Sequence, residues 1–104
     1  GVTVIGKVFD GDSGEAMIGL SIVEYGNYRN GILTDTTGRF ELVFEQENPI
    51  LIVSGFDEPI YVQIHPDRIN TIYINKRLEK CSEKLHAKVK KYERLQRSSK
   101  FENE

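Results

Sequence analysis

The chain has 104 residues, 38% hydrophobic and 29% charged, which is enough for one domain with a single modest core. No run of about 20 apolar residues is present, which excludes a transmembrane helix, and a single cysteine, Cys81, excludes an internal disulfide and an all-cysteine metal site. Four basic and eleven acidic residues give residues 1–75 a net charge of −7, whereas ten basic and five acidic residues give residues 76–104 a net charge of +5. We therefore expect two structural regimes to meet near Asn75.

Short strands are expected along the first 75 residues, because β-branched and aromatic residues recur between turn-forming segments. The strand pattern begins directly, so any signal peptide is expected either to have been removed or never to have existed. Its fourth strand would turn Phe40, Leu42 and Phe44 inward. Its fifth, ILIVS, has no alternation, which suits a strand buried on both faces. The seven expected strands are residues 2–9, 18–26, 30–35, 39–44, 50–54, 60–64 and 71–75.

Seven short strands with a turn signal about every ten residues predict an all-β fold, specifically a β-sandwich. Parallel strands need crossover connections of a dozen or more residues, usually helical. No helical pattern of that length interrupts the strands, so a parallel sheet with crossover helices is not expected.

After Asn75, apolar residues recur at spacings of three and four, which predicts an amphipathic basic helix over residues 77–97. It follows a sandwich formed by residues 1–76, and residues 98–104 are expected to fray. Cys81 lies on the predicted apolar stripe, where we expect a small buried hydrophobe. The stripe consists of Leu78, Cys81, Leu85, Val89, Tyr92 and Leu95.

Three interpretations of this helix remain open. It can pack on the sandwich or on a second copy of the chain, it can lead into another domain or a partner protein, or its lysines can meet an anionic surface. The stripe has no Trp or Phe and only one Tyr, so it is poorly suited to membrane burial. No stacking aromatics alternate with the lysines, so nucleic-acid binding is not expected.

The segment TDTTGRF, residues 34–40, concentrates an acid, hydroxyls and a guanidinium, as a catalytic loop would. Its spacing instead favours a structural turn. Asp35 can accept hydrogen bonds from amides two residues on, and Gly38 can adopt a positive φ. Phe40 would then enter the core, so we expect Asp35, Gly38 and Phe40 to form a turn between two strands.

No metal, cofactor or catalytic site is expected from the remaining motifs. DGDSGE, residues 10–15, resembles a calcium loop, but an EF-hand needs an oxygen ligand at its fifth position and Gly at its sixth, which are here Gly14 and Glu15. A turn is favoured there. His65 and His86 fall in different elements without partners at ligand spacing. No nucleophile motif or phosphate loop is present, so the chain is not expected to be an enzyme.

Together, these segments resemble the carboxypeptidase regulatory-like domain over residues 2–75. The pattern is G-x-V-x-D, a turn, spaced glycines and then T-D-x-x-G-x-F, which is its most specific part. The usual Pro before Gly19 is Ile18 here, and the basic helix lies outside the pattern. The matching residues are Gly6, Val8, Asp10, Gly14, Gly19, Gly26, Gly31, Thr34, Asp35, Gly38 and Phe40.

The resemblance implies a seven-stranded, Greek-key, transthyretin-like β-sandwich. Such domains are usually non-catalytic, and they precede the plug of TonB-dependent glycan importers in the outer membrane of Bacteroidetes-type bacteria. The expectation carried over is a periplasmic or outer-membrane-associated location and an accessory role. No plug or barrel follows, so the importer role does not transfer as a whole.

The leading expectation is therefore a non-catalytic protein-interaction module of the cell envelope, with a protein partner or a second copy bound through the helix. The alternative is a carbohydrate-binding module that uses an exposed Tyr-bearing loop. Its candidate ligand or partner surface is Tyr25, Tyr28 and Arg29. A hydroxyisourate hydrolase on the same architecture is not expected, because residues 1–64 contain no His and the chain lacks that family's C-terminal Y-R-G-S.

Overall fold

The computed structural model describes the backbone of residues 1–102 and the side chains of residues 1–98. It contains seven strands and one long C-terminal helix, so the prediction of seven strands followed by a helix is confirmed. In chain order the elements are β1 (Val2–Asp10), β2 (Ser21–Glu24), β3 (Asn27–Leu33), β4 (Arg39–Phe44), β5 (Ile50–Ser54), β6 (Ile60–Gln63), β7 (Ile69–Ile74) and α1 (Lys76–Glu102).

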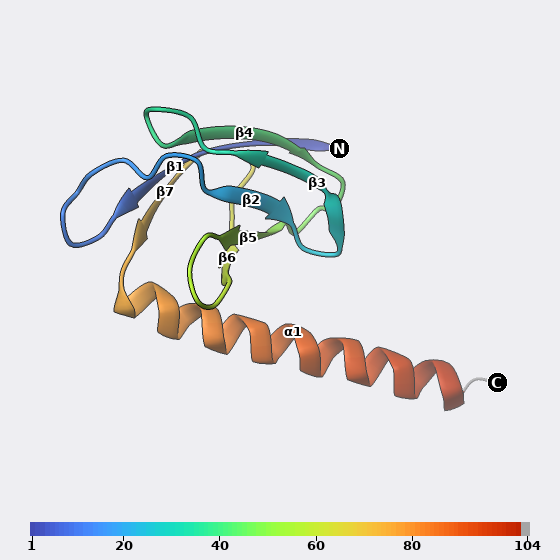
Figure 1. The fold of residues 1–104 in the computed structure, drawn as a ribbon. Coiled ribbons are helices and arrows are strands. Elements are labelled where there is room, and N and C mark those ends of the chain that lie inside the picture. Colours follow the sequence, from blue (N-terminus) through green and yellow to red (C-terminus); the bar gives the residue numbers. More distant parts are fainter. Residues whose placement is uncertain (103–104) are drawn as a thin grey trace.

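The strands form two sheets that face each other, in the orders β4-β1-β7 and β3-β2-β5-β6. All neighbouring strands are antiparallel except β1 and β7, which pair in parallel. The rest of the sandwich, rather than a crossover helix, connects these two strands. The long helix α1 runs along the outside of the four-stranded sheet, beside β6, and its C-terminal part extends past the sandwich (Figure 1).

Several element boundaries differ from the predicted ones. Expected strand 18–26 is reduced to Ser21–Glu24, because the Gly19 amide bonds to the Thr34 carbonyl and Tyr25 and Gly26 form the turn into β3. The helix begins one residue before the expected position and continues five residues beyond residue 97. Residues 98–102, which were expected to fray, are thus helical, and residues 103–104 of the expected tail lie outside the described residues.

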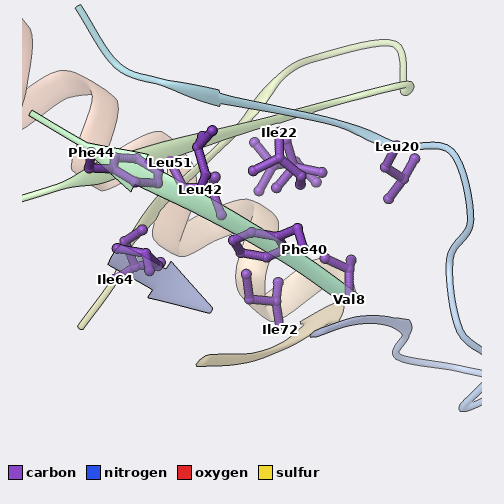
Figure 2. Packing of buried hydrophobic residues seen from close by; sticks show 12 residues of the cluster. Val8, Leu20, Ile22, Phe40, Leu42, Phe44, Leu51, Ile64 and Ile72 are labelled. Atoms are coloured by element: carbon purple, nitrogen blue, oxygen red, sulfur yellow. The ribbon is translucent and has the colours of Figure 1, made fainter. Parts of the chain in front are cut away.

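The hydrophobic core lies between the two sheets (Figure 2). Phe40, Leu42 and Phe44 point inward from β4 as predicted, while Glu41 and Val43 between them are exposed. This alternation is the pleat of a half-buried strand. The core residues are Val4, Val8, Leu20, Ile22, Phe40, Leu42, Phe44, Leu51, Val53, Ile60, Ile64 and Ile72.

Strand β5 is buried on both faces, as its unbroken apolar sequence predicts. Leu51 and Val53 belong to the core between the sheets. Ile52 points the other way but is also buried. Its cross-strand neighbour on β6 is Tyr61, whose ring stacks on His86 of α1. The helix therefore covers the outer face of the four-stranded sheet at this point.

Residues 34–39 form a closed turn between β3 and β4. One carboxylate oxygen of Asp35 accepts hydrogen bonds from the Thr37 amide, the Thr37 hydroxyl and the Arg39 amide at 2.7–2.9 Å. The Gly38 amide donates to the Asp35 carbonyl, and the φ of Gly38 is +77°. The hydrogen bond from the Thr37 hydroxyl, followed by those from the two amides, lowers the pKa of Asp35. The carboxylate closes the turn, and Phe40 follows it into the core.

Glu24, at the end of β2, is a fully buried carboxylate that joins the two sheets. Its Oε1 accepts from the side-chain amides of Asn30 at 2.9 Å and Asn27 at 3.5 Å. Its Oε2 accepts from the backbone amides of Glu45 at 2.9 Å and Gln46 at 3.1 Å, directly after β4. Burial raises the pKa of Glu24, but these hydrogen bonds lower it by more, so it lies below the ordinary value of 4.5.

Two further buried polar side chains, Thr34 and Asn70, tie connecting segments to the sandwich. The Thr34 hydroxyl donates to the Met17 carbonyl and accepts from the Leu20 amide, so the β3–β4 connection is tied to the segment before β2. The Asn70 side chain donates to the carbonyls of Ile5 and His65 and accepts from the His65 amide. These contacts satisfy backbone groups that the connections would otherwise leave buried and unpaired.

Substituting Gly38 with Ala should destabilise the fold more than substituting Gly14. Both glycines have a φ of +77° and share the cost of a left-handed residue. A Cβ on Gly38 would lie 2.5 Å from the Val8 carbonyl oxygen, whereas a Cβ on Gly14 meets nothing within 4 Å. We expect the excess loss for Gly38→Ala to be about 1–3 kcal/mol in urea unfolding. Equal losses for the two variants would contradict this account.

Substituting Glu24 with Gln should lower the free energy of unfolding by about 2–4 kcal/mol, because an amide nitrogen would face N–H donors and a charge-assisted network would be lost. Urea unfolding followed by circular dichroism measures the loss. The matched control is Glu41→Gln on the exposed face of β4, which should stay within about 0.5 kcal/mol of the wild type. A loss for Glu24→Gln as small as the control's would show that the carboxylate is not required.

The contribution of Glu24 should also depend on pH. Because its folded-state pKa is lowered, its stabilisation is fully present above the unfolded value of about 4.5 and is lost as the pH falls through the folded pKa. The difference between wild type and Glu24→Gln should thus be constant above about pH 5.5 and shrink below about pH 4.5. If the difference in unfolding free energy is the same at pH 5.5 and below pH 4.5, the lowered pKa of Glu24 is contradicted.

Candidate interaction surface on the C-terminal helix

Helix α1 begins immediately after the last strand, and Asn75 sets its start. The Asn75 side-chain oxygen accepts a hydrogen bond from the Leu78 amide at 2.9 Å, and its carbonyl accepts one from the Glu79 amide. This is the contact of an N-cap residue. Since β7 ends at Ile74, the helix leaves the three-stranded sheet directly and turns beneath the four-stranded one (Figure 1).

The first half of α1 is attached to the edge strand β6. The Tyr61 amide donates to the Ser82 hydroxyl at 2.8 Å, and Ser82 is buried. The Tyr61 ring stacks on His86 with a centroid separation of 4.2 Å and an interplanar angle of 8°. Edge strands carry unpaired amides that can join other chains, so this contact both orients the helix and covers an edge.

The second half of α1 is attached through Tyr25, in the turn between β2 and β3. Its hydroxyl donates a hydrogen bond to the Glu93 carboxylate, and its ring meets that of Tyr61 edge to face at a centroid separation of 6.0 Å. Burial, followed by the hydrogen bond and charge of Glu93, raises the pKa of Tyr25, so the hydroxyl keeps its proton as the donor. Burial also raises the pKa of Tyr61. The helix is thereby held at two points three turns apart.

The side of α1 that faces the sandwich contains only part of the predicted apolar stripe. Leu78, Leu85 and Val89 of that stripe are half-buried, but Cys81, Tyr92 and Leu95 are exposed. The prediction of a buried Cys81 was therefore wrong. The reason is that polar residues hold the helix: the contacts of Ser82, His86 and Glu93 turn it so that one edge of the apolar stripe points away from the sheet.

The residues of the predicted ligand surface differ in exposure. Tyr25 is half-buried and occupied by its contact with Glu93. Tyr28 and Arg29 lie on β3, where both are exposed. Asp35, Gly38 and Phe40 lie in the turn before β4 and its first residues, where the Asp35 carboxylate is occupied by Thr37 and Arg39.

A hollow of about 770 Å³ lies between α1 and the connection from β5 to β6. Its lining is acidic, with Asp57 and Glu58 on the connection and Glu79 and Glu83 on the helix. Phe56, Tyr61 and His86 supply its aromatic part. Further along the helix, a smaller hollow is lined by Lys90, Glu93, Arg94 and Arg97.

The acidic and basic residues of these hollows continue along one side of the helix. Glu79, Glu83, Lys90, Arg94 and Arg97 are separated by four, seven, four and three residues, and such spacings return to the same side at 3.6 residues per turn. All five are exposed. None forms an ion pair among the residues whose side chains are described. This arrangement was not predicted from the sequence, where the helix lysines were considered only as a surface for an anionic partner.

The DGDSGE segment and the loop that contains His65 are held by hydrogen bonds or ion pairs to nearby residues. The Asp10 carboxylate accepts from the amides of Asp12 and Ser13, which closes the DGDSGE turn. The backbone of His65 bonds to Asn70, and Asp67 pairs with Arg68 at 3.7 Å. In the described part of the chain, no three His, Cys, Asp or Glu side chains are arranged to hold a metal ion. No helix among the described residues is long and apolar enough to cross a bilayer.

Comparison with known proteins assigns no family to the chain. No protein-family model matches it, and no curated protein has a significantly similar sequence.

Substituting Ser82 with Ala should weaken the attachment of α1 by leaving the Tyr61 amide without its partner. We expect a loss of about 1–2 kcal/mol in unfolding free energy and faster hydrogen exchange at the Tyr61 amide. The matched control is Ser98→Ala, at an exposed position of the same helix, which should change neither quantity. Unchanged exchange at Tyr61 in Ser82→Ala would show that the helix is held by other contacts.

Proposed function

We propose that this chain is a non-catalytic protein-interaction module in which the sandwich holds α1 as a rigid, exposed binding element. The observation that carries the proposal is the specific attachment of the helix through Ser82, His86 and Glu93. These contacts fix the rotation of α1 about its own axis, and so they determine which side chains it presents. A helix that served only to cover the sheet would not leave half of its apolar stripe exposed, as Cys81, Tyr92 and Leu95 are here.

The exposed part of α1 has the composition of a contact surface. Cys81, Tyr92 and Leu95 are exposed apolar or aromatic side chains, surrounded by lysines and arginines. Aromatic and arginine side chains dominate the energetics of many protein interfaces. The helix also extends past the sandwich, where both of its flanks are open to a partner (Figure 1).

Within this proposal, the sandwich is a Greek-key, transthyretin-like domain of the carboxypeptidase regulatory-like kind. The support is the T-D-x-x-G-x-F sequence, whose Asp35 and Gly38 form the turn before β4, and the position of β4 beside β1 after the β2–β3 hairpin. A return of the fourth strand to lie beside the first is one feature of a Greek key. The accessory role and the periplasmic or outer-membrane-associated location rest on the same sequence resemblance.

Site-specific photo-cross-linking tests the proposed binding element. A photoreactive amino acid placed at Tyr92 or at Ala87 samples the two flanks of α1, and the labelled chain is irradiated both alone and in an extract of the cells that make it. We expect discrete protein adducts, identified by mass spectrometry, from at least one of these positions.

The matched control carries the same group at Val43, on the exposed face of β4. It should give no discrete adduct. Adducts that are as frequent at Val43 as on the helix, or that are absent from both helix positions, would contradict a binding role for α1.

A further inference from the structure

One side of α1 carries charges in an order that does not stabilise a single helix. Glu79 and Glu83 are one turn apart, and so are Lys90 and Arg94. Like charges at this spacing destabilise a helix, whereas opposite charges stabilise it. The helix dipole favours Glu79 in the first turn, but its effect falls off within the first and last turns and does not extend to Glu83 or Lys90. The dipole therefore does not account for the order of these charges.

The same order is self-complementary when a second helix runs antiparallel to the first. The register that sets Glu83 opposite Lys90 also sets Glu79 opposite Arg94, because both like-charged pairs have a spacing of four residues. A two-fold axis near residues 86–87 then repeats both ion pairs on the other half of the interface. Each like-charged pair of one chain faces a pair of opposite charge in the other.

The centre of this register allows two helices to approach closely. The axis passes beside Ala87, an exposed residue with a small side chain. Small side chains at a crossing point permit the shorter interaxial distances of packed helices. At the two ends Lys76 would lie opposite Arg97, and there Asp57 and Glu58 contribute two more carboxylates from the rim of the 770 Å³ hollow. The basic side chains of the second chain can enter this hollow, where four carboxylates lie close together.

We propose that two copies of this chain pair through α1 in this antiparallel register, with Glu79 and Glu83 of each copy bound to Arg94 and Lys90 of the other. The proposal rests on the proposed function, because it names a second copy as the protein that the exposed helix binds. The association is driven by charges at an exposed surface, so it weakens as salt rises.

Charge reversal in the full chain tests the pairing, with mass measured by sedimentation velocity. At about 100 µM chain and about 50 mM salt, the wild type should sediment at about twice the chain mass of 11.9 kDa, and at about 500 mM salt it should shift toward the monomer. The variants E79K/E83K and K90E/R94E should each be monomeric under the low-salt condition. Their dissociation constants should rise by at least about tenfold.

Mixing separates this interface from any general effect of charge. E79K/E83K makes the whole side basic and K90E/R94E makes it acidic, so an equimolar mixture should form a heterodimer. The fourfold variant E79K/E83K/K90E/R94E, which exchanges the two ends, should recover the homodimer. The control K84E/K91E reverses two charges on the side of α1 away from this register and should remain dimeric. Circular dichroism confirms that each variant is folded.

The outcomes separate this proposal from the proposed function. A wild type that is monomeric at low salt, half-variants that still dimerise, or a mixture that does not associate would each overturn the antiparallel pair. If any of these occurs while photo-cross-linking at Tyr92 or Ala87 captures a different protein, the binding role of the helix stands and its partner is not a second copy. Monomeric half-variants, a heterodimer in their mixture and a dimeric fourfold variant would together support the antiparallel pair.

Discussion

The buried carboxylate of Glu24 is the constraint on which the closure of the sandwich depends. A charge without solvent is costly unless its oxygens are fully hydrogen-bonded. Glu24 meets this requirement only when β3, which carries Asn27 and Asn30, and the segment that follows β4 are both in place. Burying one side chain thus requires parts of both sheets to assemble at once. Satisfied polar groups of this kind favour one arrangement of the strands over alternative packings.

The position of α1 follows from the closed sandwich. Once β6 forms the edge of the four-stranded sheet, its outward Tyr61 amide needs an acceptor, and Ser82 provides one. The stacking of His86 on Tyr61 and the bond from Tyr25 to Glu93 then fix the rotation of the helix. The sheet consequently determines which charges of α1 face solvent, through these polar contacts together with the half-buried part of the apolar stripe.

Much of the fold could be predicted from the sequence, because its signals are local. The alternation of Phe40, Leu42 and Phe44 and the spacing of Asp35 and Gly38 each depend on residues within one turn or strand. The role of Glu24 could not be predicted, because its amide partners at Glu45 and Gln46 lie more than 20 residues away. The orientation of α1 was missed for a related reason. Ser82, His86 and Glu93 are polar residues that look solvent-exposed until Tyr61 and Tyr25 are known to lie beside them.

The parallel pairing of β1 with β7 has a consequence for how the molecule folds. Among the described strands, β7 has no partner other than β1, and the helix starts from the end of β7. The start of α1 is therefore placed by the pairing of two strands that are far apart in the sequence. Contacts between such distant segments slow folding, because the loop between them must close first. During synthesis, α1 is made after all seven of these strands, so its binding sites on Tyr61 and Tyr25 can form before it docks.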